Sequence, residues 1–113
     1  MVALTDFAVG EKSEAQNEIH LRLLARPQRE SLRVRVHGSE ALDLAWLAAG
    51  RLNASIMLSN LAWDVSAGVL LVREAGGVIV DHDGSAHTLR SRFTIAAAPS
   101  LVEPLRQIVS EVM

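Results

Sequence analysis

The stretch from Leu61 to Asp81, LAWDVSAGVLLVREAGGVIVD, constrains the fold more than any other part of the chain. Its first part is strongly apolar and predicts a helix, which ends at Gly76-Gly77 because glycine adopts the left-handed backbone that terminates helices. The β-branched run Val78–Val80 then predicts a short strand. Asp64 lies near the start of the helix, where the helix dipole keeps a carboxylate ionised. The chain therefore contains a helix, a turn and a strand, with one acid at the helix N-terminus.

Strand and helix patterns alternate along the whole chain. Strands are predicted over residues 2–9, 31–36, 54–58, 78–80 and 93–98, and helices over residues 13–26, 40–49, 61–75 and 100–112. The first helix is expected to end at Pro27, and the last to begin with a capping box formed by Ser100 and Glu103. A chain of 113 residues has room for a single hydrophobic core. The alternation therefore predicts one α/β domain.

The helix predicted over residues 40–49 is apolar nearly all round, so we expect it to be central and buried. Asp43 is its exception, and a buried acid needs a partner, for example an arginine. Gly38 and Ser39 precede the helix, and the free N–H groups at a helix start can bind an anion or a hydroxyl group. Most junctions of this kind are only helix caps, so this feature alone is a weak indication of a site.

Composition excludes several classes of function. The net charge is −2 without a basic block, so binding to nucleic acid or to a membrane surface has no electrostatic basis. The absence of cysteine rules out disulfides, thiolate zinc sites and a cysteine nucleophile. We expect a cytoplasmic protein, since neither a signal-peptide pattern nor a run of about 20 apolar residues occurs. Half of the residues are hydrophobic, which predicts apolar surface for a partner.

Most residue patterns that carry catalytic chemistry are missing from the sequence. The histidines at positions 20, 37, 82 and 87 lack the spacing of metal ligands and are expected at the surface. The polar turn at residues 81–84 lacks most ligands of a calcium loop. What remains is Asp64 together with Gly38-Ser39. On spacing alone, a magnesium ligand and a carboxylate that only stabilises its own helix are equally good interpretations of Asp64.

Four short motifs follow one another along the chain. They are Gly38-Ser39 with Ala41-Leu42-Asp43, Ala48-Ala49-Gly50-Arg51-Leu52, Trp63-Asp64 with Ala67-Gly68, and Glu74-Ala75-Gly76-Gly77. In identity and spacing they resemble the C-terminal half of the inositol monophosphatase family, and the resemblance extends from the first strand to the last helix. It implies a single α/β domain over residues 1–113, with a mixed sheet flanked by helices, that forms the C-terminal half of a layered αβαβα phosphatase fold.

The resemblance also implies a function. Members of the family hydrolyse phosphate monoesters with magnesium ions, which generate the attacking hydroxide and stabilise the leaving alkoxide. Asp64 would be the metal ligand from this half. Gly38, Ser39 and the backbone of Glu40 would lie beside the hydroxyls or the phosphate of the substrate. Inositol-specific members have a glutamate at the position of Met57, and a thioether binds a polyol hydroxyl only weakly, which counts against myo-inositol phosphate.

The family's remaining metal ligands lie in an N-terminal half, on a Glu-Glu motif and a DxxDGT motif, and neither occurs in this sequence. The resemblance therefore implies that the N-terminal half of the same enzyme is a partner. We expect this chain alone to be inactive and to bind Mg²⁺ only weakly. The implied substrate of the intact enzyme is a polyol or sugar phosphate, with histidinol phosphate, fructose bisphosphate and nucleotide 3′-phosphates as alternatives. The alternative to an enzyme is a non-catalytic α/β module for binding or assembly. It would form a homo-oligomer, because the resemblance implies a face that the absent half would cover.

Overall fold

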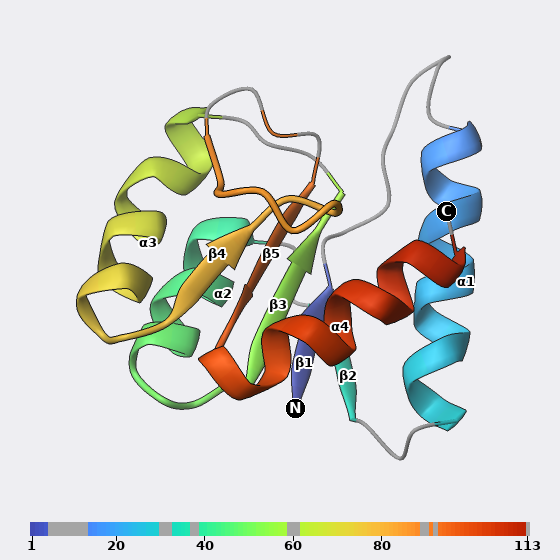
Figure 1. Ribbon diagram of the computed structural model, residues 1–113, viewed down its shortest axis with the longest axis horizontal. Helices are drawn as coiled ribbons and strands as arrows, with labels where there is room; N and C mark the ends of the chain where they lie inside the picture. Colours follow the sequence, from blue (N-terminus) through green and yellow to red (C-terminus); the bar gives the residue numbers. More distant parts are fainter. Residues whose placement is uncertain are drawn as a thin grey trace.

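Strands and helices alternate in the computed structural model, which describes residues 1–4, 14–29, 33–36, 39–58, 62–88, 91 and 93–112 (Figure 1). In chain order they are β1 (Val2–Leu4), α1 (Glu14–Arg29), β2 (Val34–Val36), α2 (Glu40–Ala48), β3 (Ala54–Met57), α3 (Ala62–Glu74), β4 (Val78–Val80), β5 (Thr94–Ala97) and α4 (Pro99–Val112). At helix positions 16, 26–29, 40 and 62–65, only the backbone is described. The α/β class predicted from the alternating patterns is confirmed.

The described strands form one mixed sheet in the order β2-β1-β3-β5-β4. β1 pairs in parallel with both β2 and β3, so that Val2 lies between Val34 and Ala54. β5 lies between β3 and β4 and is antiparallel to both. The predicted mixed sheet with flanking helices is therefore confirmed.

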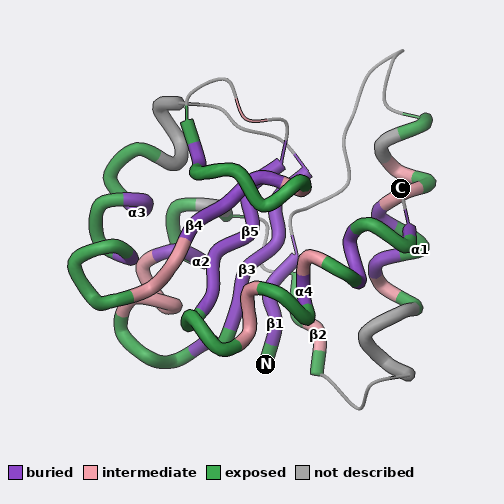
Figure 2. Tube along the Cα trace, viewed as in Figure 1, coloured by how far each residue is buried: buried purple, intermediate pink, exposed green. Residues whose placement is uncertain are grey.

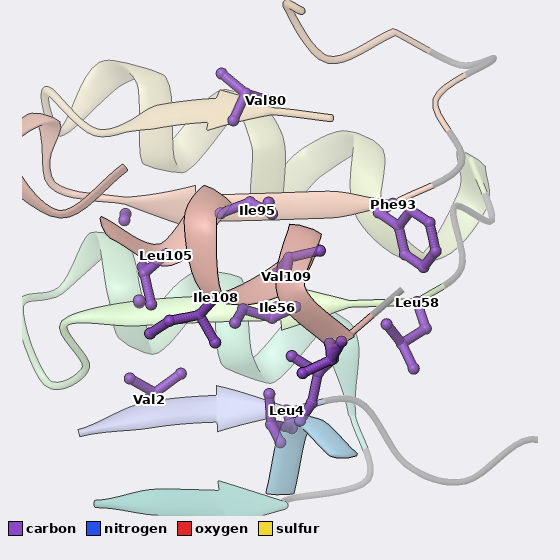
Figure 3. Packing of buried hydrophobic residues seen from close by; sticks show 14 residues of the cluster. Val2, Leu4, Ile56, Leu58, Val80, Phe93, Ile95, Leu105, Ile108 and Val109 are labelled. Carbon is purple, nitrogen blue, oxygen red and sulfur yellow. The ribbon is translucent and has the colours of Figure 1, made fainter. Parts of the chain in front are cut away.

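Side chains alternate along each strand and enter two separate hydrophobic cores. Ile56 of β3 and Ile95 of β5 point towards α1 and α4, into the larger core (Figure 3). The neighbouring residues Met57 and Ala96 belong to the second core, beneath α2 and α3. The first core contains Val2, Leu4, Leu23, Ala54, Ile56, Leu58, Val80, Phe93, Ile95, Ala97, Leu105, Ile108, Val109 and Val112, and the second contains Leu44, Met57, Val69, Val72, Ile79 and Ala96.

The order of the strands marks one end of the sheet as the expected place for a ligand. β1 and β3 are neighbours, but the helices that follow them lie on opposite faces: α1 packs with α4, and α3 packs with α2. In α/β proteins, ligands bind at such a switch, in the crevice outside the carboxyl ends of the two strands. Here that end of the sheet is where Leu4 and Met57 lie.

Two predicted helix boundaries are wrong. α1 continues past Pro27 to Arg29. Because Pro27 lies in the last turn, it removes one backbone hydrogen bond without disrupting a long segment after it. α4 begins at Pro99, whose fixed φ suits the first position of a helix, so Ser100 and Glu103 do not form the predicted capping box. Glu103 instead accepts a hydrogen bond from Arg106, with the Nε and Oε2 atoms 3.0 Å apart.

The helix α2 is less buried than its apolar sequence predicts. Leu42 is 39% exposed, and among the described side chains of α2 only Asp43 and Leu44 are fully buried. The helix lies on the outside of the sheet rather than at the centre of the domain, so one of its apolar faces is uncovered in this chain. The first predicted strand is confirmed over Val2–Leu4, and its remaining residues lie outside the described ranges, as do Gly38 and His37.

Candidate active site

α2 begins at the carboxyl end of the sheet, with Ser39 as its N-cap. Ser39 has an extended backbone (φ −142°, ψ 109°), and its hydroxyl oxygen accepts a hydrogen bond from the Leu42 N–H at 3.2 Å. This bond satisfies one of the N–H groups that a helix leaves free in its first turn. The dipole of the helix favours an anion at this point, and the exposed Ser39 hydroxyl can still donate its proton to a ligand.

α3 begins at the same end of the sheet, because it follows β3. Position 64 falls in its first turn, so the predicted place of Asp64 on a helix start is confirmed. A carboxylate in this turn is stabilised in its ionised form by the helix dipole. Glu40 is the first residue of α2 and contributes a backbone N–H to the neighbouring helix start.

The two helices run in the same direction and pack against each other at Gly68 and Leu44 (Figure 1). Glu40 lies one helical turn before Leu44, and Asp64 lies one turn before Gly68. The starts of the two helices therefore both lie about one turn from the contact. The structure thus brings together two helix starts that are far apart in the sequence.

Met57, which is also a predicted site residue, ends β3 and pairs with Thr94 of β5. Its side chain is fully buried and packs in the core beneath α2 and α3 together with Leu44 and Val69. In this chain the thioether therefore contributes to packing directly under the two helices, at the carboxyl end where the helices start.

Two buried hydroxyl groups lie on the face of the sheet that α2 and α3 cover, and the sequence did not predict either of them. Ser55 and Thr94 are fully buried, and within the described part of the chain neither hydroxyl has a hydrogen-bond partner. They lie on adjacent strands, since Met57, the partner of Thr94, is two residues from Ser55. Each such hydroxyl costs free energy, because a buried polar group loses its bonds to water. The strand alternation that directs Met57 inwards also directs Ser55 inwards, and this pattern was the signal that could have found it.

The acidic turn after β4 is held together by its own hydrogen bonds. Asp81 Oδ1 accepts hydrogen bonds from the backbone N–H groups of His82 (2.6 Å) and Phe93 (3.1 Å), and lies 2.8 Å from His82 Nδ1. Asp83 Oδ1 accepts from the hydroxyl and the N–H of Ser85, and these bonds lower the pKa of the Asp83 carboxyl. Asp81 therefore ties the turn to the start of β5, and the turn has a structural role.

The prediction that the histidines lie at the surface is wrong for two of them. His20 is buried on α1, because it lies on the face that carries Leu23 and Ile19 towards the first core. His87 is buried after the turn, and its backbone carbonyl accepts a hydrogen bond from Arg73. Burial, and secondarily the nearby positive charge of Arg73, lower the pKa of the His87 imidazole.

Among the described residues, no group of three or more acids or histidines lies close enough together to hold a metal ion, so a complete metal site is not present there. Asp64 is at a helix start that suits an ionised ligand. A magnesium ion in a protein usually has several oxygen ligands, and one carboxylate supplies too few of them. The residues present therefore fit one side of a metal site and not a whole one.

In the part of the chain that the structure describes, the helices are also too short or too polar to cross a membrane.

The mixed sheet with flanking helices defines an α/β protein, and the free N–H groups at the starts of α2 and α3 are of the kind that can bind an anion. The model of the inositol monophosphatase family matches residues 2–113, and the chain belongs to this family.

The relatives extend well beyond the part that this chain matches. Inositol-1-monophosphatase ImpA of Mycolicibacterium smegmatis is 37% identical over 109 residues, which cover 96% of this chain and 40% of the relative. Nus factor SuhB of Pasteurella multocida is 46% identical over 68 residues, or 60% of this chain and 26% of the relative. The structure of Thermotoga maritima IMPase matches with a TM-score of 0.82 and 27% identity, over 98% of this chain and 41% of that protein. The chain thus spans less than half the length of these relatives.

Proposed function

We propose that this chain is the C-terminal half of a magnesium-dependent phosphomonoesterase and acts together with an N-terminal half of the same enzyme. The observation that carries the proposal is the pair of adjacent helix starts at the carboxyl end of the sheet, one with Ser39 and the other with Asp64. Belonging to the inositol monophosphatase family supports phosphate-ester hydrolysis as the reaction.

Each helix start has its own role in the proposed site. The N–H groups at the start of α2 and the Ser39 hydroxyl bind the phosphate or a hydroxyl of the substrate, because both are donors at the positive end of a helix dipole. Asp64 supplies one oxygen ligand to magnesium. When bound, magnesium ions supply an activated hydroxide and stabilise the leaving oxygen.

Two features support a second half as an obligatory partner. The Glu-Glu and DxxDGT motifs, on which the remaining metal ligands are expected, do not occur in this sequence. Large apolar side chains are also exposed on these helices, with Leu42 on α2 exposed by 39% and Leu70 and Leu71 on α3 by 60% and 50%. Figure 2 shows that much of α3 is exposed in this chain. Covering this surface would stabilise a complex. We therefore expect the chain alone to be inactive.

For the substrate, we propose a polyol or sugar phosphate other than myo-inositol phosphate. Support comes from Met57, because its buried thioether offers no strong partner to a ring hydroxyl. Histidinol phosphate, fructose bisphosphate and nucleotide 3′-phosphates are the alternatives, and hydrolysis rates over a panel of these esters would select among them. We place the protein in the cytoplasm, where such phosphorylated metabolites occur.

A chimeric enzyme tests the proposal. In it, this chain replaces the matching segment of the Mycolicibacterium smegmatis relative, and hydrolysis of phosphate monoesters is measured against Mg²⁺ concentration. We expect magnesium-dependent turnover that Asp64→Asn lowers by about 100-fold or more, since even residues that only support metal ligands change activity by 10- to 100-fold. Ser110→Ala, at an exposed position of α4, is the control and should leave turnover unchanged. Robust, Asp64-dependent turnover by the 113-residue chain alone would refute the need for a second half.

A non-catalytic module for assembly is the second candidate. It is favoured by the same exposed leucines on α2 and α3, and by the relatives named as Nus factors. This candidate predicts that the chain forms a homo-oligomer without its second half. Sedimentation that shows a monomer at high concentration, together with no binding of a dye that detects apolar surface, would count against it.

A further inference from the structure

α2 and α3 approach each other more closely at Gly68 than any other residue would permit. A Cβ atom added to Gly68 would lie 2.6 Å from Leu44 Cβ and 2.6 Å from Leu44 Cδ1. Carbon atoms in contact lie about 3.5–4.0 Å apart, so only a hydrogen atom fits between the helices at this point. Rotation of the side chain can move Leu44 Cδ1 away. It cannot move Cβ, because the backbone of α2 fixes the position of that atom.

Leu44 also has no free space into which it could retreat. It is fully buried and packs in the core with Met57, Val69 and Ala96. Protein cores are close-packed and transmit strain instead of absorbing it. A larger residue at Gly68 must therefore be accommodated by a greater distance between the two helix backbones.

The contact lies close to both helix starts. Asp64 precedes Gly68 by one turn on α3, and Glu40 precedes Leu44 by one turn on α2. One turn of an α-helix is only about 5.4 Å long, so the backbones of both helix starts lie close to the contact. A change in spacing at the contact therefore changes the spacing of the helix starts.

We propose that Gly68 and Leu44 are positioning residues, which set the distance between the metal ligand on α3 and the substrate-binding start of α2. The inference rests on the proposed function, since it assigns those two roles to Asp64 and Ser39. Neither positioning residue touches the substrate. Their close contact fixes where an oxygen ligand on one helix stands relative to the N–H groups of the other.

NMR of the 113-residue chain with Mn²⁺ tests the inference without requiring activity. Mn²⁺ binds the same oxygen ligands as Mg²⁺, and its unpaired electrons broaden the signals of amide groups nearby. In the wild-type chain we expect broadening that Asp64→Asn abolishes, in the first turn of α3 and also at Ser39 and Glu40. In Gly68→Ala, the broadening on α3 should remain, and the broadening on α2 should be lost or clearly reduced.

Gly77→Ala is the matched control. A Cβ atom there would lie 2.6 Å from Val72 Cγ1, so the packing conflict is similar, but it lies after the end of α3, far from the helix starts. It should lower the thermal stability of the chain and leave the broadening on α2 unchanged. The double variant Gly68→Ala with Leu44→Gly moves the glycine to the other helix and should shift the broadening on α2 back towards the wild-type pattern, although the lost Leu44 side chain leaves a cavity that lowers stability. Circular dichroism identifies the variants that fold, and the chimeric enzyme provides the test for any variant that does not fold as the isolated chain.

The outcomes separate the inference from the proposed function. Asp64-dependent broadening that is equal on α2 in the wild type and in Gly68→Ala overturns the positioning role and leaves the proposed function intact. Absence of any Asp64-dependent broadening, both in this chain at high Mn²⁺ concentration and in the chimeric enzyme, overturns the metal-ligand role, and the inference with it. In the chimeric phosphatase, Gly68→Ala should also lower kcat by about 100-fold, as a misplacement of about 1 Å can.

Discussion

The two faces of the sheet are built differently. On one face, α4 covers the strands with a continuous stripe of buried residues, and the core beneath it is closed by large side chains (Figure 3). On the other face, α2 and α3 meet through a glycine, and two hydroxyl groups are buried without partners among the described residues. Exposed leucines occur on both sides, with Leu21 on α1 and with Leu42, Leu70 and Leu71 on α2 and α3. The difference indicates that the α1–α4 face stabilises the domain, whereas features of the α2–α3 face lower its stability. We attribute this cost to the proposed site and to the surface proposed to bind the second half.

Truncation of the α4 core should have the largest effect. Leu105→Ala removes a side chain that is 3% exposed, and we expect it to lower the free energy of unfolding by about 2–5 kcal/mol, because a cavity replaces the lost contacts. Urea denaturation measures the change. Leu21→Ala, at a position on α1 that is 58% exposed, is the control and should change the free energy by about 0.5 kcal/mol or less. Equal effects of the two variants would contradict the stabilising role of the α4 core.

Removal of a buried hydroxyl from the α2–α3 face should act in the opposite direction. Thr94→Val keeps the shape of the side chain and removes the hydroxyl without a partner, so we expect it to raise the free energy of unfolding by about 1–3 kcal/mol. Ser55→Ala should also stabilise the chain, but it loses a little volume. Urea denaturation is again the measurement, with the exposed Ser110→Ala as the control. A destabilised Thr94→Val variant would contradict the view that this face gives up stability.

Acid should destabilise the chain through the buried His87, which follows β4 and whose carbonyl accepts a hydrogen bond from Arg73 of α3. Because burial lowers its pKa in the folded state, the unfolded chain binds the proton more readily. Stability is therefore highest above the usual histidine pKa of about 6.5 and falls as the pH drops through the lowered folded value. His87→Gln should flatten this part of the curve of unfolding free energy against pH. An unchanged slope in His87→Gln would show that another group causes the acid sensitivity.

Substitution of the exposed leucines should have the smallest effect on stability. Leu70→Ser with Leu71→Ser should change the free energy of unfolding by about 0.5 kcal/mol or less, because both side chains are half-exposed or more in this chain. The same pair of substitutions should weaken self-association, or binding of the second half, in sedimentation experiments. A large loss of stability in the monomer would mean that this surface already belongs to the core of the domain.

The sequence predicted local features of the fold well where one residue type determines the backbone. Gly76 ends α3 with a φ of 86°, and the N–H of Gly77 donates to the carbonyl of Val72, as the double glycine indicated. The buried stripe of α4 also follows from its spacing, whereas its start was predicted one residue late because Pro99 opens the helix. The burial of His20 could not be predicted in this way, because it depends on the packing of α1 against α4.

The candidate site was predictable in its parts and not in its arrangement. Ser39 as a helix cap and Asp64 in a first turn follow from local patterns. That the two helix starts lie together follows only from the strand order, which no local pattern encodes. Gly68 illustrates the limit, because a glycine inside a helix indicates a cost in helix stability, and its purpose becomes visible only when Leu44 is placed against it.

The position of β5 between β3 and β4 has a consequence for how the chain folds during synthesis. β4 is made before β5, yet it joins the sheet only through β5. Until residues 94–97 have been made, β3 presents an open edge and β4 has no strand beside it. Unpaired edges of this kind recruit other chains, so the growing chain should be most prone to aggregation after β4 has emerged from the ribosome and before β5 has. The last strand in the sequence is therefore the one that completes the sheet.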